Sequence, residues 1–449
     1  MAEILETINS LVWGLPALVM ILGVGIYLTV RTGFVQFRLF PKAIRHFGRM
    51  FRGRNKSSFR SLCTALGATV GTGNLVGVAG ALCLGGPGSI FWMWVCGLLG
   101  MATKYSEAVL AVRYRVRKGE EILGGPMYII SRGMGSRWRW LAGVYSFLGV
   151  FAALGVGNAT QINAMLGILG EAAGWEQRGN ILVAGAVLAL LVGLLLSGGA
   201  KRIGQAAERL VPLAAGGYIL LCLFVLILCY DRVPGAFGVI LRGAFEPKAV
   251  TGGALGSAFC ALRVGCARGV FTNEAGMGTA AIAHASAEVK HPAEQGMMGL
   301  MEVFLDTIVI CTLTALVILC SGVSIPYGKD AGGRLTSEAF GAICGSWSEV
   351  ILAGSICCFA LATILGWGLY GLRCAVYLLG PGVERWFVLG QMGAAFLGAV
   401  LETGVIWTAA ETVNGLMAIP NLIALGVLSG EVARLTRDYR KTELPRQAC

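Results

Sequence analysis

The chain has 449 residues, of which 56% are hydrophobic and 13% are charged. Ordinary soluble domains have about 25% charged residues, so this composition excludes a soluble globular protein and predicts a membrane protein. The net charge of +12 is explained by basic loops beside anionic lipid and does not indicate nucleic-acid binding. The fourteen cysteines stand scattered in apolar stretches without a CxxC pair, which predicts small core residues rather than disulfides or metal ligands.

About eleven apolar stretches are long enough to cross a bilayer core, which takes about 20 residues. They lie near 10–31, 60–84, 89–113, 141–170, 180–198, 206–230, 252–287, 296–321, 350–379, 387–407 and 411–431. No soluble domain fits between them, so we expect one all-α polytopic domain over residues 1–449. The start of the chain, with Glu3 and Glu6, lacks the basic residues of a cleaved signal peptide, and the first stretch is expected to stay as a helix.

Lysine and arginine concentrate in cytoplasmic loops, and their distribution predicts the orientation. With the N-terminus outside, the inner loops hold nine basic residues within 31–60, seven within 113–139, three within 201–209 and five in the tail from Arg434, whereas the outer loops hold six. Eleven crossings then leave the C-terminus in the cytoplasm.

Two of the stretches contain matching interruptions. Gly-Thr-Gly-Asn at 71–74 and Thr-Asn-Glu-Ala-Gly at 272–276 each break an apolar helical segment. Irregular backbone survives at membrane depth only where it is buried in protein or lines a cavity, and a pair of such breaks in corresponding places marks a transporter binding site. We therefore expect a peripheral helix and basic loop (1–59), inverted repeats at 60–230 and 250–432, and a cytoplasmic tail (433–449).

Six motifs resemble those of the alanine/glycine:cation symporter family (sodium:alanine symporters). They occur in consistent order at 68–74 (ATVGTGN), 85–94 (GGPGSIFWMW), 124–128 (GGPMY), 272–278 (TNEAGMG), 287–292 (AEVKHP) and 363–367 (TILGW). The resemblance implies a leucine-transporter-type fold with a 5+5 inverted repeat, and sodium-coupled uptake of small neutral amino acids. After Trp367 the chain departs from the family, since Gly368, Leu369 and Leu372 stand where a polar, aromatic and acidic run is usual.

The expected cargo is alanine or glycine with Na⁺ as coupling ion and no organic cofactor, in a bacterial inner membrane. Proton coupling, or a different neutral amino acid such as serine or glutamine, remains the alternative, because carboxylates at membrane depth can titrate. The sequence leaves the oligomeric state open.

The first break has a chemistry that can be deduced from its residues. Gly71 and Gly73 let the chain unwind and expose backbone N–H and C=O groups. The half-helix that starts near Asn74 offers free N–H groups to a carboxylate, and the freed carbonyls suit a hard cation. Side-chain oxygens of Thr72, Asn74, Thr272 and Asn273 are predicted to contact substrate or ion, while capping of the broken helix ends is the alternative.

The resemblance implies two ion sites. In one, Asn74 and Thr272 bind an ion that also touches the substrate carboxylate. In the other, the backbone around Gly67 and Val70 and the hydroxyl of Thr363 hold a second ion.

Gln161 and Asn163 follow a glycine-rich segment in the fourth stretch. A buried amide must find partners, so these side chains either bind the substrate or join helices. Trp367, beside Gly366 and Gly368, is predicted to form a flat wall that limits the pocket volume, with simple packing as the alternative.

Charged residues inside the stretches are functional by default. We expect Arg263, Arg268, Glu302 and Asp306 to pair across the seventh and eighth stretches, Glu274 to lie in the break, and these groups to act in gating or ion pairing. Lys104 and Glu107, three residues apart, are expected to form a local pair. His284, Glu288 and His291 resemble a metal cluster, but their place at a helix end argues against it.

Other functional classes lack their signatures. The sequence has no HExxH, GxSxG or Walker motif, which argues against a membrane enzyme or an ATP-driven pump. A channel would show repeated carbonyl or charged rings around an oligomeric pore.

Overall fold

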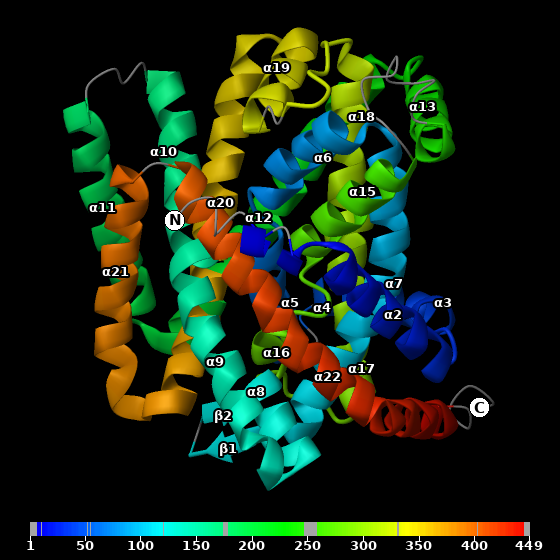
Figure 1. Ribbon diagram of the computed structural model, residues 1–449, viewed down its shortest axis with the longest axis vertical. Coiled ribbons are helices and arrows are strands. Elements are labelled where there is room, and N and C mark those ends of the chain that lie inside the picture. Colours follow the sequence, from blue (N-terminus) through cyan, green and yellow to red (C-terminus); the bar gives the residue numbers. More distant parts are fainter. Residues whose placement is uncertain are drawn as a thin grey trace.

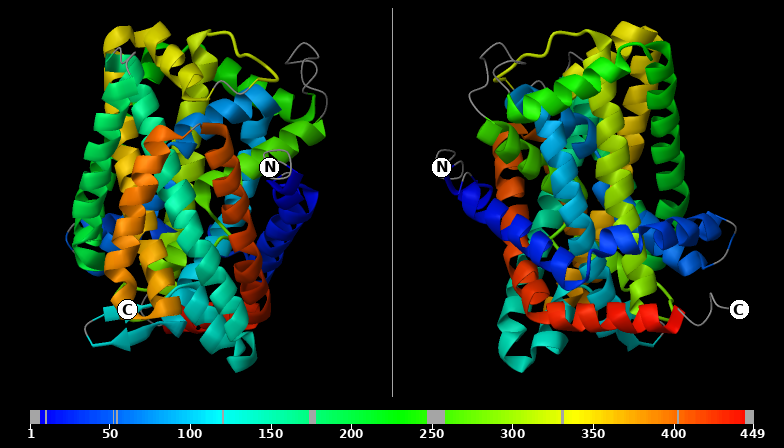
Figure 2. Two further views of the ribbon diagram at one scale, coloured as in Figure 1. Left: turned by 60° about the vertical axis from the view of Figure 1, so that its left-hand side comes forward. Right: turned by 90° about the vertical axis from the view of Figure 1, so that its right-hand side faces the viewer.

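The computed structural model describes residues 7–443 apart from 10, 52, 54, 120, 174–177, 247–257, 330–331 and 402. Most of the helices run lengthwise through one bundle (Figures 1 and 2). Seven described helices are long and apolar enough to cross a membrane, and a bent pair raises the number to eight. An all-α polytopic membrane protein is therefore confirmed. Eleven crossings remain a prediction, because three expected crossings coincide with helices of only 16 or 17 residues.

The first part of the chain forms helices that lead to the first break and beyond it. They are α2 (Leu15–Arg31), α3 (Val35–Arg38), α4 (Phe40–Phe51), α5 (Lys56–Thr69), the π-helical turn η1 (Gly73–Gly77), α6 (Val78–Gly85), α7 (Gly88–Tyr114), α8 (Pro126–Tyr128), η2 (Ile129–Met134), the 3₁₀ turn η3 (Ser136–Trp138), α9 (Arg139–Leu154), the π-helical turn η4 (Gly155–Ala159), α10 (Thr160–Ala173), α11 (Arg178–Leu196), α12 (Gly199–Leu228) and α13 (Val233–Phe245).

The second part of the chain contains the second break. It contains α15 (Ala258–Asn273), α16 (Thr279–His284), α17 (Pro292–Val303), the π-helical segment η5 (Phe304–Cys311), α18 (Thr312–Ser321), α19 (Gly332–Cys344), α20 (Ser346–Leu379), the 3₁₀ turn η6 (Pro381–Val383), α21 (Glu384–Val400) and α22 (Thr403–Glu443).

Both predicted breaks are present. The first is a 51° bend between Lys56–Thr69 and Gly73–Gly85. In the second, α15 ends at Asn273 and α16 starts at Thr279, with positive φ angles at Glu274 (53°), Gly276 (96°) and Gly278 (78°). Glycine adopts this region without the steric cost of a Cβ, so the motif sequence accounts for the break.

The two broken helices lie antiparallel. The half-helix before the first break, α5, packs beside the half-helix after the second, α16, and α6 packs beside α15. The chain therefore runs in opposite directions through the two breaks (Figure 1). This crossing brings the irregular backbone of both breaks into the middle of the bundle.

Several elements were not expected from the sequence. An antiparallel hairpin of β1 (Val116–Lys118) and β2 (Glu121–Leu123) lies at one end of the bundle, with Val116 opposite Leu123 (Figure 1). At the other end, α13 and α19 cover the helix ends (Figure 1). The π-helical segments η4 and η5 interrupt two long helices, and such segments occur frequently at functional sites.

Candidate functional site

The first break contacts two other helices through side-chain oxygens. The Thr72 hydroxyl donates to Oε1 of Gln161 on α10 at 3.1 Å, and the Gln161 amide donates to the carbonyl of Val156 in η4 at 3.1 Å. A Cβ on Gly71 would lie 2.6 Å from Oγ1 of Thr363, so a larger residue here would displace the Thr363 side chain. The structure thus brings Thr72 and Gln161 together, as expected for one polar site.

The residues expected at the second ion site also meet. The Thr363 hydroxyl of α20 donates to the Gly67 carbonyl of α5 at 3.2 Å. Val70 follows at the end of α5 and is buried, with extended backbone that turns away from the helix. Carbonyl and hydroxyl oxygens are the ligands that a hard cation prefers, so this donor set fits sodium.

Asn74 lies at the centre of a second polar cluster. Its Oδ1 accepts from the Gly71 N–H at 3.0 Å, and its Nδ2 donates to Oδ1 of Asp306 at 2.7 Å. Asn74 Nδ2 also contacts the Cys311 thiol at 3.3 Å. The Thr272 methyl lies 3.7 Å from where a Cβ of Gly73 would stand, so Thr272 lies beside the first break, while its hydroxyl donates to the Gly269 carbonyl at 2.9 Å.

The second break is held by its own side chains and by Trp367. Asn273 Oδ1 accepts from the Ala275 N–H at 3.0 Å, and its Nδ2 donates to the Thr307 hydroxyl at 3.1 Å. Glu274 accepts from the Thr279 hydroxyl at 2.6 Å and from the Trp367 indole N–H at 3.0 Å. Asn273 thus stabilises the turn that follows it, and Trp367 is linked to the second break.

Trp367 is fully buried and lies against the glycine-rich turn η4. The position of Gly157 leaves no room for a Cβ because the Trp367 side chain occupies that space. The ring of Tyr370 lies edge-on to it at 5.8 Å, centroid to centroid. The indole is thus fixed between η4, Tyr370 and Glu274.

Glu107 contacts the second break directly, which corrects the expected local pair with Lys104. Its Oε1 accepts from the N–H groups of Gly276 (2.9 Å) and Gly278 (3.1 Å) and from the Asn421 amide (2.8 Å). Lys104 lies one helical turn earlier on α7 but forms its ion pair with Glu302 at 3.1 Å. Both charged residues could be singled out from the sequence, but their partners lie on other parts of the chain and could not be predicted.

A chain of buried polar groups joins α5 to α7. The Ser58 hydroxyl donates to Gln295 Oε1 at 2.5 Å, and the Gln295 amide lies 2.7 Å from His284 Nδ1. His284 Nε2 in turn lies 2.8 Å from Glu302 Oε2. All of these side chains are at 0% exposure. Buried polar groups of this kind require partners, and together with the ion pair between Glu302 and Lys104 of α7 they connect four helices.

The expected pairing of arginines on α15 with Glu302 and Asp306 was wrong. Glu302 contacts Lys104 and His284, and Asp306 contacts Asn74 and Thr307. Arg268 instead lies 3.8 Å from Glu411 of α22, with about a quarter of each side chain exposed. Arg263 and Arg268 of α15 line a cavity, whereas both acids are buried in the bundle interior.

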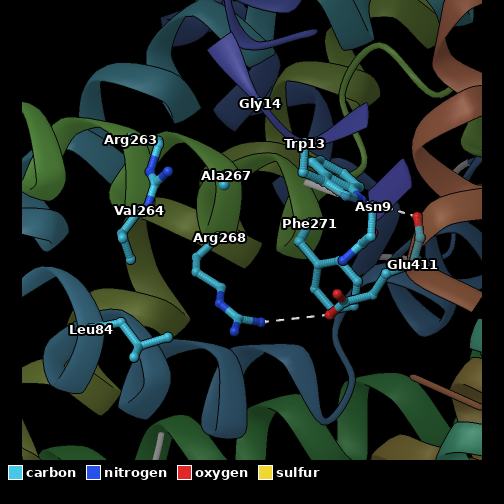
Figure 3. A pocket seen from close by; sticks show the side chains of 10 residues that line it. All are labelled: Asn9, Trp13, Gly14, Leu84, Arg263, Val264, Ala267, Arg268, Phe271 and Glu411. Carbon is cyan, nitrogen blue, oxygen red and sulfur yellow. Dashed lines mark hydrogen bonds and ion pairs between the residues drawn. The ribbon is translucent and has the colours of Figure 1, made fainter. Parts of the chain in front are cut away.

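This cavity, the vestibule, has a volume of about 290 Å³. Its lining comes from the N-terminal segment, α6, α15 and α22: Asn9, Trp13, Gly14, Leu84, Arg263, Val264, Ala267, Arg268, Phe271 and Glu411 (Figure 3). The Phe271 ring belongs to this lining and also lies 3.7 Å from where a Cβ of Gly73 would stand. One aromatic ring therefore lies between the vestibule and the first break.

The remaining candidates have structural partners. Asn163 donates to the Gly398 carbonyl at 3.1 Å, which confirms the interpretation of this amide as a link between helices. His291, outside the membrane-spanning segments, accepts from the Ala293 N–H through Nδ1 at 3.2 Å and caps α17. Burial lowers the pKa of His291, which favours the neutral ring that this cap needs. The described residues contain no group of three possible metal-ligating side chains.

Two antiparallel helix breaks, lined by oxygen ligands and surrounded by buried charges, define a membrane transport protein. Residues 1–448 match the model of the sodium:alanine symporter family. The chain belongs to this family, whose members are sodium-coupled amino acid transporters and not enzymes.

Relatives match it over nearly their whole length. An uncharacterized transporter of Haemophilus influenzae is 44% identical over 97% of this chain and 96% of its own. The sodium/alanine symporter AgcS of Methanococcus maripaludis is 41% identical over 98% of this chain and 97% of its own. The probable sodium/glutamine symporter GlnT of Bacillus subtilis is 35% identical over 98% of this chain and 92% of its own.

Proposed function

We propose that this protein takes up alanine, and glycine as a second substrate, together with sodium, by alternating access around its two broken helices. The observation that carries the proposal is the antiparallel crossing of the breaks, which gathers freed backbone groups and neutral oxygens in the bundle centre. A zwitterion and a hard cation both need such groups. The relative AgcS, named as a sodium/alanine symporter, supports the choice of alanine.

The substrate carboxylate binds the N–H groups at the start of η1, with Thr72, Gly73 and Asn74 around it. A helix N-terminus favours negative charge there. Gln161, Thr272 and Asn273 supply further polar contacts, and Trp367 closes the pocket against Gly157. A bulky wall on a glycine-lined turn leaves space for a small side chain only.

Sodium occupies two positions in this proposal. One ion lies at Asn74 and Thr272 beside the substrate carboxylate, and a second binds the carbonyls of Gly67 and Val70 with the hydroxyl of Thr363. The contact between Thr363 and Gly67 supports the second position. Moving one sodium inward across about 100 mV supplies about 2.3 kcal/mol before its concentration gradient is added.

The proposed fold is of the leucine-transporter type, with repeats at 60–230 and 250–432 after a peripheral first helix. The basic segments 31–60 and 113–139 support a cytoplasmic location for the β1–β2 end, because lysine and arginine concentrate in cytoplasmic loops. The N-terminus and the vestibule then face outside, in a bacterial inner membrane, and the C-terminus lies inside. Arg268 and Glu411 form a gating ion pair at the outer entrance. Glu274 and Asp306 stabilise the two breaks through their hydrogen bonds, and Glu302 stabilises the inner helices through its ion pair with Lys104.

The test is uptake of radiolabelled alanine into proteoliposomes with an inward sodium gradient, and with choline in place of sodium. Accumulation only with sodium supports the proposal, and competition by unlabelled glycine, serine and glutamine then ranks the substrates. Uptake that follows a proton gradient without sodium would overturn the ion assignment. Dominant competition by glutamine, the substrate in the name of GlnT, would overturn the choice of alanine.

A further inference from the structure

We propose that Glu107 is a positioning residue that holds the second break in its binding shape through the backbone N–H groups of Gly276 and Gly278. The inference rests on the proposed function for its effect on transport. The structural claim, that the Glu107 carboxylate binds the N–H groups of the broken helix, rests only on the observed contacts.

The contacts converge on one atom. Oε1 of Glu107 accepts three hydrogen bonds, from Gly276 N–H at 2.9 Å, Gly278 N–H at 3.1 Å and Asn421 Nδ2 at 2.8 Å. Asn421 also donates to the Gly276 carbonyl at 2.8 Å. Glu107 and Asn421 are at 0% exposure. The N–H and the carbonyl of Gly276 are thus hydrogen-bonded to side chains from α7 and α22, respectively.

These contacts are needed because the break frees N–H groups away from water. Gly276 and Gly278 have φ angles of 96° and 78°, so their N–H groups leave the helical pattern. A buried N–H without a partner costs about 1 to 3 kcal/mol, and hydrogen bonds to a charged acceptor are roughly twice as strong as neutral ones. A carboxylate from α7 is therefore well suited to stabilise the turn.

The position of the turn determines the position of the proposed pocket residues on both sides of it. Asn273, before the turn, is bonded to Thr307 and to the Ala275 N–H. Glu274 is bonded to the Trp367 indole. A shift of the Gly276 peptide would move both, although Glu107 itself lies outside the group that contacts the substrate.

The arrangement also distinguishes the two breaks. At the second break an internal carboxylate already occupies the N–H groups of Gly276 and Gly278. The carboxylate of an amino acid has no free donors there, which directs it to the first break. Glu107 thereby contributes to the orientation of the substrate.

Glu107 has one competing role, which is to neutralise Lys104. Lys104 interacts electrostatically with Glu107, Glu274 and Glu302, and Oε2 of Glu107 has no hydrogen-bond partner among the described residues. Two conservative variants separate the roles. Glu107→Gln keeps an oxygen at the same distance from the backbone and removes the charge, whereas Glu107→Asp keeps the charge and withdraws the oxygen by one methylene.

The first measurement is hydrogen–deuterium exchange of purified protein, read in peptides that span 273–279. This readout does not depend on transport, so it remains valid if the proposed function fails. We expect protection in the unsubstituted protein and in Glu107→Gln, and faster exchange in Glu107→Asp. Equal protection in all three proteins, or greater protection in Glu107→Asp than in Glu107→Gln, would overturn the proposal.

The second measurement is sodium-driven alanine uptake by the same variants. We expect Glu107→Gln to raise KM by about threefold, since its hydrogen bonds are weaker but present, and Glu107→Asp to raise KM by about tenfold or more because N–H groups lose their acceptor. The maximal rate changes less than KM in both. The exposed Glu338→Gln on α19 controls for acid-to-amide exchange. Better transport by Glu107→Asp than by Glu107→Gln would assign a charge role instead.

Discussion

The indole N–H of Trp367 donates to Oε1 of Glu274 at 3.0 Å and thereby joins the middle of α20 to the second helix break. The residues are 93 positions apart in the chain, and both are buried. Glu274 lies in the left-handed region with φ 53°, which is uncommon for a residue with a side chain. The orientation of the proposed pocket wall is therefore linked to the geometry of the break.

Substitution of Trp367 should change substrate selectivity. Trp367→Ala removes the wall, and we expect larger neutral amino acids to compete with alanine uptake more strongly than they do in the unsubstituted protein. Loss of a buried tryptophan also costs about 3 to 5 kcal/mol, so Trp367→Phe serves as a milder variant that keeps a wall and loses the bond to Glu274. Competition by a series of amino acids of increasing size is the measurement. Unchanged selectivity in Trp367→Ala, with reduced expression only, would mean that the ring merely packs.

Asn74→Ala should abolish sodium-driven uptake or reduce it at least about tenfold. The substitution removes a proposed ion ligand and its bond to Asp306 at 2.7 Å, and charge-assisted bonds of this kind are among the stronger ones. The measurement is uptake as a function of sodium concentration, with size-exclusion chromatography to confirm folding. Asn163→Ala, which loses only a bond to the Gly398 carbonyl, is the matched control. Normal sodium dependence in Asn74→Ala would exclude its role as a ligand.

The hydroxyl of Thr363 is predicted to bind the second sodium ion. Thr363→Val has nearly the same shape without the hydroxyl, and we expect the sodium concentration at half-maximal uptake to rise about tenfold, as loss of one oxygen ligand for a hard cation would cause. Thr363→Ser keeps the hydroxyl and should remain close to the unsubstituted protein. Equal sodium dependence in both variants would remove Thr363 from the site.

The pair of Lys104 and Glu302 should affect stability more when one member is lost than when both are. Both side chains are at 0% exposure and 3.1 Å apart. Removal of one partner of a buried pair costs about 3 to 5 kcal/mol because the other charge remains uncompensated, whereas neutralising both leaves no uncompensated charge. Lys104→Met should therefore lower the melting temperature more than Lys104→Met combined with Glu302→Gln, in which the neutral glutamine can still hydrogen-bond to His284. The measurement is thermal unfolding in detergent, and additive effects of the two substitutions would contradict this account.

The sequence predicted the breaks because their cause is local. Gly71, Gly73, Gly276 and Gly278 stand in apolar segments where no soluble loop is possible, and at membrane depth such residues are informative. The same local reasoning predicted that the buried amide of Gln161 would find a partner, and the structure shows it bonded to Thr72 and to the Val156 carbonyl. It also marked Lys104, Glu107, Glu302 and Asp306 as charges too costly to leave unpaired inside a membrane.

The pairing of these groups could not be predicted from spacing. Glu107 and Lys104 are three residues apart but do not pair with each other. Glu107 accepts from N–H groups of a distant turn, and Lys104 pairs with the carboxylate of Glu302. The π-helical segment η5 (Phe304–Cys311) changes the helix register around Asp306 and brings it to Asn74. A partner 232 residues away depends on helix packing, which leaves no local signal in the chain.

Phe271 lies at the base of the vestibule, with its ring beside Gly73. Rotation of a single side chain is faster than rearrangement of helices, which takes microseconds to milliseconds. If this ring is the barrier between vestibule and first break, solutes exchange with the outer solution many times during each movement of α5 and α16. Occupancy of the site is then set by equilibrium with the outside, and the slow helix movement sets the turnover rate.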